Sequence, residues 1–211
     1  MEELNVYKRN VELLANTKSN KKVLNGGLPY AAILFGVLFK HCKEIARIYC
    51  TGLKPDLVCL EPFWCEFCNY LNDENKKLYV LVDSLDWINN KPMQYIKKIK
   101  GVPITVKENK KVLKHKNNKR LKKRSISKTI TVKKPTDRII VKQIHPDHIK
   151  EIEMIYGEAT HFSIFDNEKF RYEYDSENYK AFGSFNQPET SQKLIELFDR
   201  IFNDPKSKII I

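Results

Sequence analysis

The chain of 211 residues lacks an apolar run long enough to cross a bilayer. The longest, residues 28–39, contains Gly36 and is followed by Lys40 and His41, whereas a membrane-spanning helix needs roughly 20 apolar residues. The acidic N-terminus, Met1-Glu2-Glu3-Leu4, also lacks the basic region of a signal peptide. We therefore expect a cytoplasmic protein with no membrane partner, in which residues 28–39 form a buried helix.

Cysteine is sparse and unevenly placed: the chain has five, all between Cys42 and Cys68. An odd number crowded into one region argues against a disulfide framework. Cys65 and Cys68 have the CxxC spacing of redox and zinc sites, but the chain before the strand expected at residue 77 is too short for a thioredoxin helix. A structural zinc site would need a second close pair of ligands. We expect no metal and no cofactor, and interpret the pair as core thiols on one helix.

Acidic residues are nearly absent from one part of the chain. The formal net charge is +12, from 38 Lys and Arg against 26 Asp and Glu. Residues 97–142 contain 18 of the basic residues and 2 of the acidic ones, which leaves 20 basic and 24 acidic for the remainder. The positive excess therefore belongs to a single segment.

The densest part of this segment, residues 107–134, contains no aromatic residue. Clustered cations attract phosphate backbones by counterion release, whereas base stacking needs aromatic rings. The pattern predicts an insertion or loop that binds nucleic acid without sequence specificity. The candidate nucleic-acid-binding residues are Lys114, Lys116, Lys119, Arg120, Lys122, Lys123 and Arg124. The alternative is a solvated loop in a protein whose frequent lysine reflects base composition.

Apolar periodicity predicts an α/β protein with a single domain over residues 1–211. Helices are expected at 5–15, 30–42, 56–72, 93–100, 146–156 and 190–202, and strands at 44–53, 77–82, 102–106, 138–143, 160–165, 170–174 and 179–185. Residues 77–82, Lys-Leu-Tyr-Val-Leu-Val, read as a strand covered on both faces of a parallel layer. Residues 102–106 are expected to be the next strand of that layer.

Two motifs in the last third of the chain form a constellation: residues 159–167, Ala-Thr-His-Phe-Ser-Ile-Phe-Asp-Asn, and residues 183–186, Gly-Ser-Phe-Asn. Together with the order of elements in the first half, they resemble the phospholipase D-like superfamily, whose motif runs as HxK, four residues, Asp, and then Gly-Ser-x-Asn. With Asp166 at the acidic position, His161 replaces the lysine and Ala159 the histidine. With His161 as nucleophile, Ser163 replaces the lysine and Glu168 the acid.

The resemblance implies a phospholipase D-like mixed sheet flanked by helices on both faces, present as one repeat instead of the family's two. A single repeat implies a homodimer or a partner protein. Since neither register restores the histidine–lysine pair, the motif is degenerate, and His161 and Asp166 are catalytic residues only if activity survives. The candidate phosphate-binding residues are Lys169, Arg171, Ser184 and Asn186. The alternative is that His161 and Asp166 are satisfied strand-end residues and that Arg171 and Glu173 form a surface ion pair.

Three functions follow. The first is a catalytically degenerate module that binds nucleic acid or another phosphodiester polyanion. Because bacterial members of the phospholipase D-like superfamily occur in nucleases and in defence against foreign DNA, the resemblance implies that this module belongs to a nuclease or defence system. The second is an active, metal-independent phosphodiesterase or nuclease that works as a homodimer through His161. The third is an interaction subunit without a ligand of its own.

Overall fold

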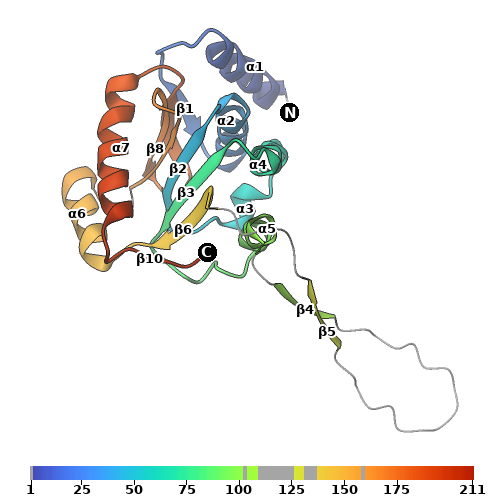
Figure 1. The fold of residues 1–211 in the computed structure, drawn as a ribbon. Coiled ribbons are helices and arrows are strands. Elements are labelled where there is room, and N and C mark those ends of the chain that lie inside the picture. The colour runs from blue at the N-terminus through green and yellow to red at the C-terminus, as the bar shows by residue number, and fades with distance from the viewer. Residues whose placement is uncertain (1, 102–103, 109–125, 131–136, 158–159) are drawn as a thin grey trace, which may run out of the picture.

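The computed structural model describes residues 2–101, 104–108, 126–130, 137–157 and 160–211. Within them, an eight-stranded sheet forms the centre of the molecule, with helices on both of its faces (Figure 1). In spatial order its strands are β1 (Val23–Gly26), β9 (Lys180–Ser184), β8 (Lys169–Asp175), β7 (His161–Phe165), β2 (Ile45–Cys50), β3 (Lys77–Val82), β6 (Ile139–Gln143) and β10 (Lys208–Ile209).

The sheet is mixed, because β2, β3 and β6 run parallel whereas every other neighbouring pair is antiparallel. Strand β2 therefore lies between a parallel neighbour, β3, and an antiparallel one, β7. Successive residues of β3 face opposite sides, so Val80 belongs to one hydrophobic cluster and Leu81 to the other. The predicted mixed sheet flanked by helices on both faces is confirmed.

The larger cluster lies between the sheet and the helices of the first half of the chain. These are α1 (Glu2–Asn16), α2 (Leu28–His41), α3 (Pro55–Val58), α4 (Phe63–Asn72) and α5 (Lys91–Lys100). Helix α2 is buried along most of its length, as its apolar composition predicts. None of the helices in the described ranges is both long and apolar enough to cross a membrane.

The smaller cluster lies on the opposite face, under α6 (Pro146–Tyr156) and α7 (Pro188–Asn203). Helix α7 begins with Pro188 in its first turn and buries a stripe that includes Leu194, Phe198 and Ile201, the helical spacing seen in the sequence. Figure 1 shows α6 and α7 together on one side of the sheet.

Two expectations about the first half differ from the structure. The helix expected over residues 56–72 is two helices, α3 and α4, because Pro62 lies between them. Pro62 packs closely on α2: a Cβ at Gly36 would come within 2.9 Å of its Cγ. The short strands β1 and β10, which add an edge at each side of the sheet, carry too few apolar residues to be predicted.

Strand β4 (Ile104–Glu108) does not continue the parallel layer, so that expectation was wrong. It pairs in an antiparallel ribbon with β5 (Ile126–Ile130), from Ile104 opposite Ile130 to Glu108 opposite Ile126. Figure 1 shows this ribbon projecting from the body of the molecule beyond α5. Of the basic segment 107–134, the structure describes only the residues in these two strands.

Candidate functional site

A cavity of about 540 Å³, counting its open mouth, lies where strand β2 ends and strand β7 begins, and β8 contributes Arg171 and Glu173 to its lining. The loop after β2 contributes Thr51, Gly52 and Leu53, and β7 contributes His161 and Ser163. Ligand sites in α/β sheets lie outside the carboxyl ends of the strands, and this cavity lies at that end of β2. Gly52 keeps this loop against Trp87, whose side chain a Cβ there would approach to 2.7 Å.

His161 is the central polar group of the cavity. Its Nε2 lies 3.1 Å from Thr51 Oγ1 and 3.6 Å from Asp83 Oδ2, and its Nδ1 lies 3.4 Å from Glu173 Oε1. Burial lowers the pKa of His161, but the hydrogen bonds and charges of Asp83 and Glu173 outweigh it, so that the pKa is raised. The two carboxylates favour the imidazolium form, in which both ring nitrogens are donors.

Glu173 lies directly opposite His161 in the β7–β8 pair. Its other oxygen, Oε2, is 2.5 Å from Arg171 Nη1. Burial raises the pKa of Glu173, yet His161 and Arg171 together hold it below its ordinary value. Arg171, Glu173, His161 and Asp83 therefore form a chain of alternating charges that sums to zero.

Arg171 is fully buried, and each of its three guanidinium nitrogens has a partner. Besides the pair with Glu173, its Nε donates to Asn25 Oδ1 at 3.2 Å and its Nη2 to the Tyr179 carbonyl at 3.4 Å. The guanidinium also stacks 4.6 Å from the Phe35 ring centroid. Burial lowers the pKa of Arg171, although a guanidinium remains charged in proteins. The structure thus shows a buried ion pair where the sequence allowed a surface one.

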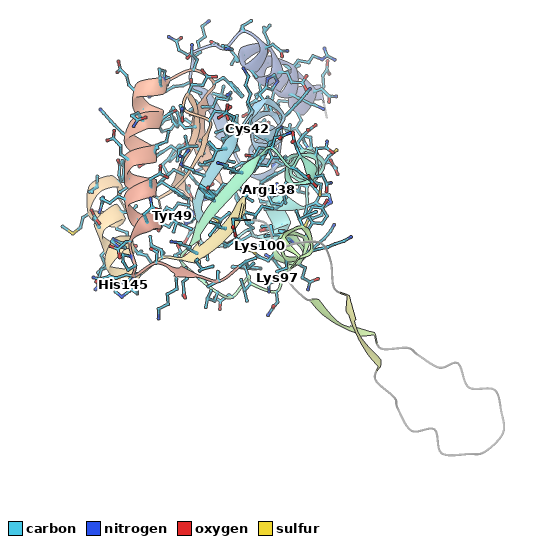
Figure 2. All side chains as sticks on the ribbon, viewed as in Figure 1. Cys42, Tyr49, Lys97, Lys100, Arg138 and His145 are labelled. Atoms are coloured by element: carbon cyan, nitrogen blue, oxygen red, sulfur yellow. The ribbon has the colours of Figure 1, made fainter. Side chains whose placement is uncertain are left out.

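Asp166 directly follows β7 at the opposite end from His161, and the four steps of extended strand from His161 to Phe165 span roughly 13 Å. The backbone of Asp166 has a positive φ of 55°. The Asp166 carboxylate accepts hydrogen bonds from the backbone amides of Lys43 at 3.0 Å and Glu44 at 2.9 Å. The Sγ atom of Cys42 is 3.5 Å from Asp166 Oδ1. Figure 2 labels Cys42 near one end of β2 and Tyr49 near the other. Asp166 therefore anchors the loop that enters β2 and lies away from the cavity.

The other proposed phosphate-binding residues cluster near Asp166. Lys169 Nζ is 2.7 Å from Asp166 Oδ2 and 3.1 Å from Glu168 Oε1, and this lysine is buried. Burial raises the pKa of Asp166, but Lys169 and the backbone amides bring it below its ordinary value. Ser184 is fully buried opposite Phe170, and its Oγ accepts from the Asn186 amide at 3.5 Å.

The predicted site residues are therefore divided. The structure brings His161 and Arg171 to the cavity, and it places Asp166, Lys169, Ser184 and Asn186 together at the other end of the same strands. Ala159 lies outside the described residues, as do all the candidate nucleic-acid-binding residues: Lys114, Lys116, Lys119, Arg120, Lys122, Lys123 and Arg124. In the ranges that the structure describes, no group of three or more His, Cys, Asp or Glu side chains is placed to hold a metal ion.

Cations also lie at the base of the ribbon. Lys97, Lys100 and Arg138 are labelled in Figure 2 near the point where α5 meets it. Two of them have partners on the body: Lys97 Nζ donates to the Ile88 carbonyl at 3.0 Å and Arg138 Nη2 to the Leu71 carbonyl at 2.6 Å. Burial lowers the pKa of Lys100. These side chains are thus held on the body by local contacts.

Sequence reasoning missed Thr51 and Asp83 as members of the site. Both follow a strand directly, Thr51 after β2 and Asp83 after β3. Because parallel neighbours end at the same edge of a sheet, polar residues just past two such strands were the signal that could have identified them.

The fold is shared with known structures, whereas the sequence is not. No protein-family model matches the chain, and no curated protein matches it in sequence. A structure of TrmBL2, described as an archaeal chromatin protein with a novel mode of DNA binding, is similar over 99% of this chain and 64% of its own, at TM-score 0.51 and 10% identity. Nuc from Salmonella typhimurium, described as a phospholipase D family member, is similar over 90% of this chain and 98% of its own, at TM-score 0.50 and 9% identity.

These similarities define the class of fold: the chain has a phospholipase D-like fold. The chain spans less than two thirds of the length of TrmBL2 and nearly all of Nuc. At 9% and 10% identity, the comparison concerns the arrangement of helices and strands and carries no residue's function from one protein to another.

Proposed function

We propose that this protein is a catalytically degenerate phospholipase D-like module that binds nucleic acid, or another phosphodiester polyanion, through its basic segment. The observation that carries the proposal is the separation of charge along the chain. Residues 109–125, which join β4 to β5, contain nine Lys and Arg and no Asp or Glu. A ribbon that projects from the body is a suitable support for a cationic segment that tracks a phosphate backbone.

The geometry of the cavity supports binding without cleavage. A phosphodiesterase of this fold class would need a nucleophile and a cation free to hold the phosphoryl oxygens. Here both His161 nitrogens face carboxylates, and Arg171 is already paired with Glu173. An incoming phosphate would also approach the carboxylate of Glu173, which lines the cavity, so the cavity lacks the electrostatic character of a phosphate clamp.

The structural neighbours are compatible with this proposal, because one is described as a chromatin protein that binds DNA. The proposal does not depend on that likeness, which concerns the fold alone. It also includes a second copy of the chain or a partner protein, since the sequence carries one degenerate motif and not two. A setting in nuclease or defence systems is suggested only by the family resemblance.

The test is binding of a fluorescently labelled oligonucleotide measured by anisotropy over a range of salt concentrations. In one variant Lys119, Arg120, Lys122, Lys123 and Arg124 are all replaced by alanine. A matched variant loses the same charge from exposed positions on the body: Lys8, Arg9, Lys21, Lys98 and Lys193.

We expect the first variant to weaken binding and to flatten the dependence of log K on log salt by up to about 4, because each lost phosphate contact removes about 0.9 from the slope on duplex DNA. The matched variant should reduce binding far less. Equal losses in the two variants would mean that net charge alone attracts the polyanion and would contradict the proposal.

The leading alternative is a working phosphodiesterase. It is favoured by the fact that His161 Nε2 faces the cavity beside Thr51, with Lys54 also in the lining. Plasmid and oligonucleotides incubated with the protein in the absence of metal distinguish the two functions. We expect no cleavage; cleavage by the natural chain that is lost in His161→Ala would establish the alternative.

The third function, an interaction subunit, makes a different prediction. In that case the natural chain shows no salt-dependent retention of any oligonucleotide. Sedimentation of the purified protein would then reveal only assembly with itself or with a protein partner.

A further inference from the structure

The cavity beside His161 has two chemically distinct halves. Its floor is formed on the helical side by Phe35 from α2, Leu57 and Val58 from α3, and Phe63 from α4. The Phe35 and Phe63 rings stack on each other with centroids 4.6 Å apart and an interplanar angle of 11°, so the floor is aromatic and closely packed. An apolar floor of this kind favours an apolar body on the ligand.

The rim provides a small number of converging polar groups. Thr51 Oγ1 and His161 Nε2 lie 3.1 Å apart, and the hydroxyl of Ser163 also lines the cavity. A threonine hydroxyl both donates and accepts, and the protonated imidazole donates. A ligand hydroxyl or amide at this point would find both kinds of partner.

The charges around the cavity oppose an ionic ligand. His161 and Arg171 are balanced by Asp83 and Glu173, so among the lining residues an added carboxylate or phosphate would find an unbalanced cation only in Lys54. An added ammonium would face the cations of His161 and Arg171 in the same way. Lys54, which also lines the cavity, is the group that an anion would have to use.

We propose that this cavity is a binding site for a small uncharged molecule with an aromatic or alicyclic body and one hydroxyl or amide group. The body lies against the apolar floor, and the polar group bonds to Thr51 and His161. The site is independent of the basic segment and goes beyond the polyanion binding proposed above.

The test uses three probes of one shape, namely benzyl alcohol, benzoate and phenyl phosphate, with affinities measured by ligand-observed NMR on the full chain. We expect benzyl alcohol to bind about tenfold more tightly than either anion, since burial of an unpaired charge is strongly unfavourable. Thr51→Val, which keeps the shape and removes the hydroxyl, should weaken benzyl alcohol about fivefold. The matched control is Thr17→Val, at an exposed position that does not line the cavity, and it should leave the affinity for benzyl alcohol unchanged.

A second variant tests whether benzyl alcohol binds in this cavity, with a separate measurement of whether the variant is folded. Leu57→Phe adds volume at the floor and should abolish binding of benzyl alcohol, while a cooperative urea-unfolding transition of the same variant shows that the chain is folded. Tighter binding of phenyl phosphate that is lost in Lys54→Ala would overturn the proposal in favour of an anion site. Failure of benzyl alcohol to bind the natural chain, or binding that survives Leu57→Phe, would also overturn it.

Discussion

The two ends of strand β7 contain similar charged groups but use them differently. At the Asp166 end, a carboxylate accepts from backbone amides of the loop before β2 and from Lys169, so that each oxygen is satisfied locally. At the His161 end, the charged groups pair with one another beside a cavity, and Nε2 bonds to Thr51 in the cavity lining. The difference shows that a polar residue at a strand end becomes structural when its partners are backbone groups, and remains available to a ligand when they are side chains at a cavity.

The first prediction breaks the ion pair at the cavity end and has the largest expected effect. Arg171→Met should reduce the free energy of unfolding by about 4 kcal/mol, because it leaves the buried Glu173 without its closest cation. Urea denaturation measures the change. The double variant Arg171→Met/Glu173→Gln should recover part of the loss, since the uncompensated charge is then removed. Additive losses would show that the two residues do not act as a pair.

The second prediction applies the same treatment to the Asp166 end. Asp166→Ala should reduce the free energy of unfolding by about 3 kcal/mol, because the buried Lys169 loses its nearest carboxylate and two backbone amides lose their acceptor. Oligonucleotide binding, scaled to the folded fraction, should stay unchanged. A selective loss of binding in a folded variant would instead restore Asp166 to a phosphate-handling role.

The third prediction uses pH to distinguish the contribution that His161 makes to stability at one end of β7 from the contribution that Asp166 makes at the other. The folded pKa of His161 is raised, so its contribution to stability is complete below the unfolded value of about 6.5 and is lost as pH rises through the folded value. The pKa of Asp166 is lowered, so its contribution is present above the unfolded value of about 4 and is lost as pH falls. His161→Gln should therefore destabilise by about 1–2 kcal/mol near pH 5.5 and by less near pH 9.

Denaturation of the natural chain and of His161→Gln at both pH values measures this change. The control is Asp166→Ala, whose destabilisation should be the same near pH 5.5 and near pH 9, because Asp166 is ionised at both. A loss in His161→Gln that grows as pH rises would show that the imidazole is neutral in the folded protein.

Much of the fold could be predicted from the sequence, because the core elements have strong periodicity. Residues 77–82 and 146–156 were assigned with the same bounds that the structure gives β3 and α6. Strand β4 was assigned to the wrong sheet, because the apolar pattern of a short strand does not specify its partner. The phospholipase D-like fold was accessible through the resemblance in motif and in order of elements.

The candidate site was predicted less well. His161 was identified, but it was grouped with Asp166, Ser184 and Asn186, which spacing along the chain does not separate from it. The antiparallel hairpin β7–β8 sends Asp166 and Lys169 to the far end of the strands, while the register pairs His161 with Glu173. Such long-range pairing depends on the tertiary arrangement, so it could not be derived from local residue patterns.

The last prediction has the smallest effect and tests Ser184, which the motif favoured for phosphate binding. Ser184 is fully buried at the Asp166 end, and its hydroxyl has one long contact, with the Asn186 amide at 3.5 Å. Ser184→Ala should therefore change the free energy of unfolding by about 0.5 kcal/mol or less and leave both oligonucleotide and benzyl alcohol binding unaltered. Denaturation and the two binding assays on one preparation measure all three quantities. Because the alanine fits the same space, a clear loss of either ligand would mean that the far end of the strands communicates with a binding surface, and the division drawn between the two ends would then fail.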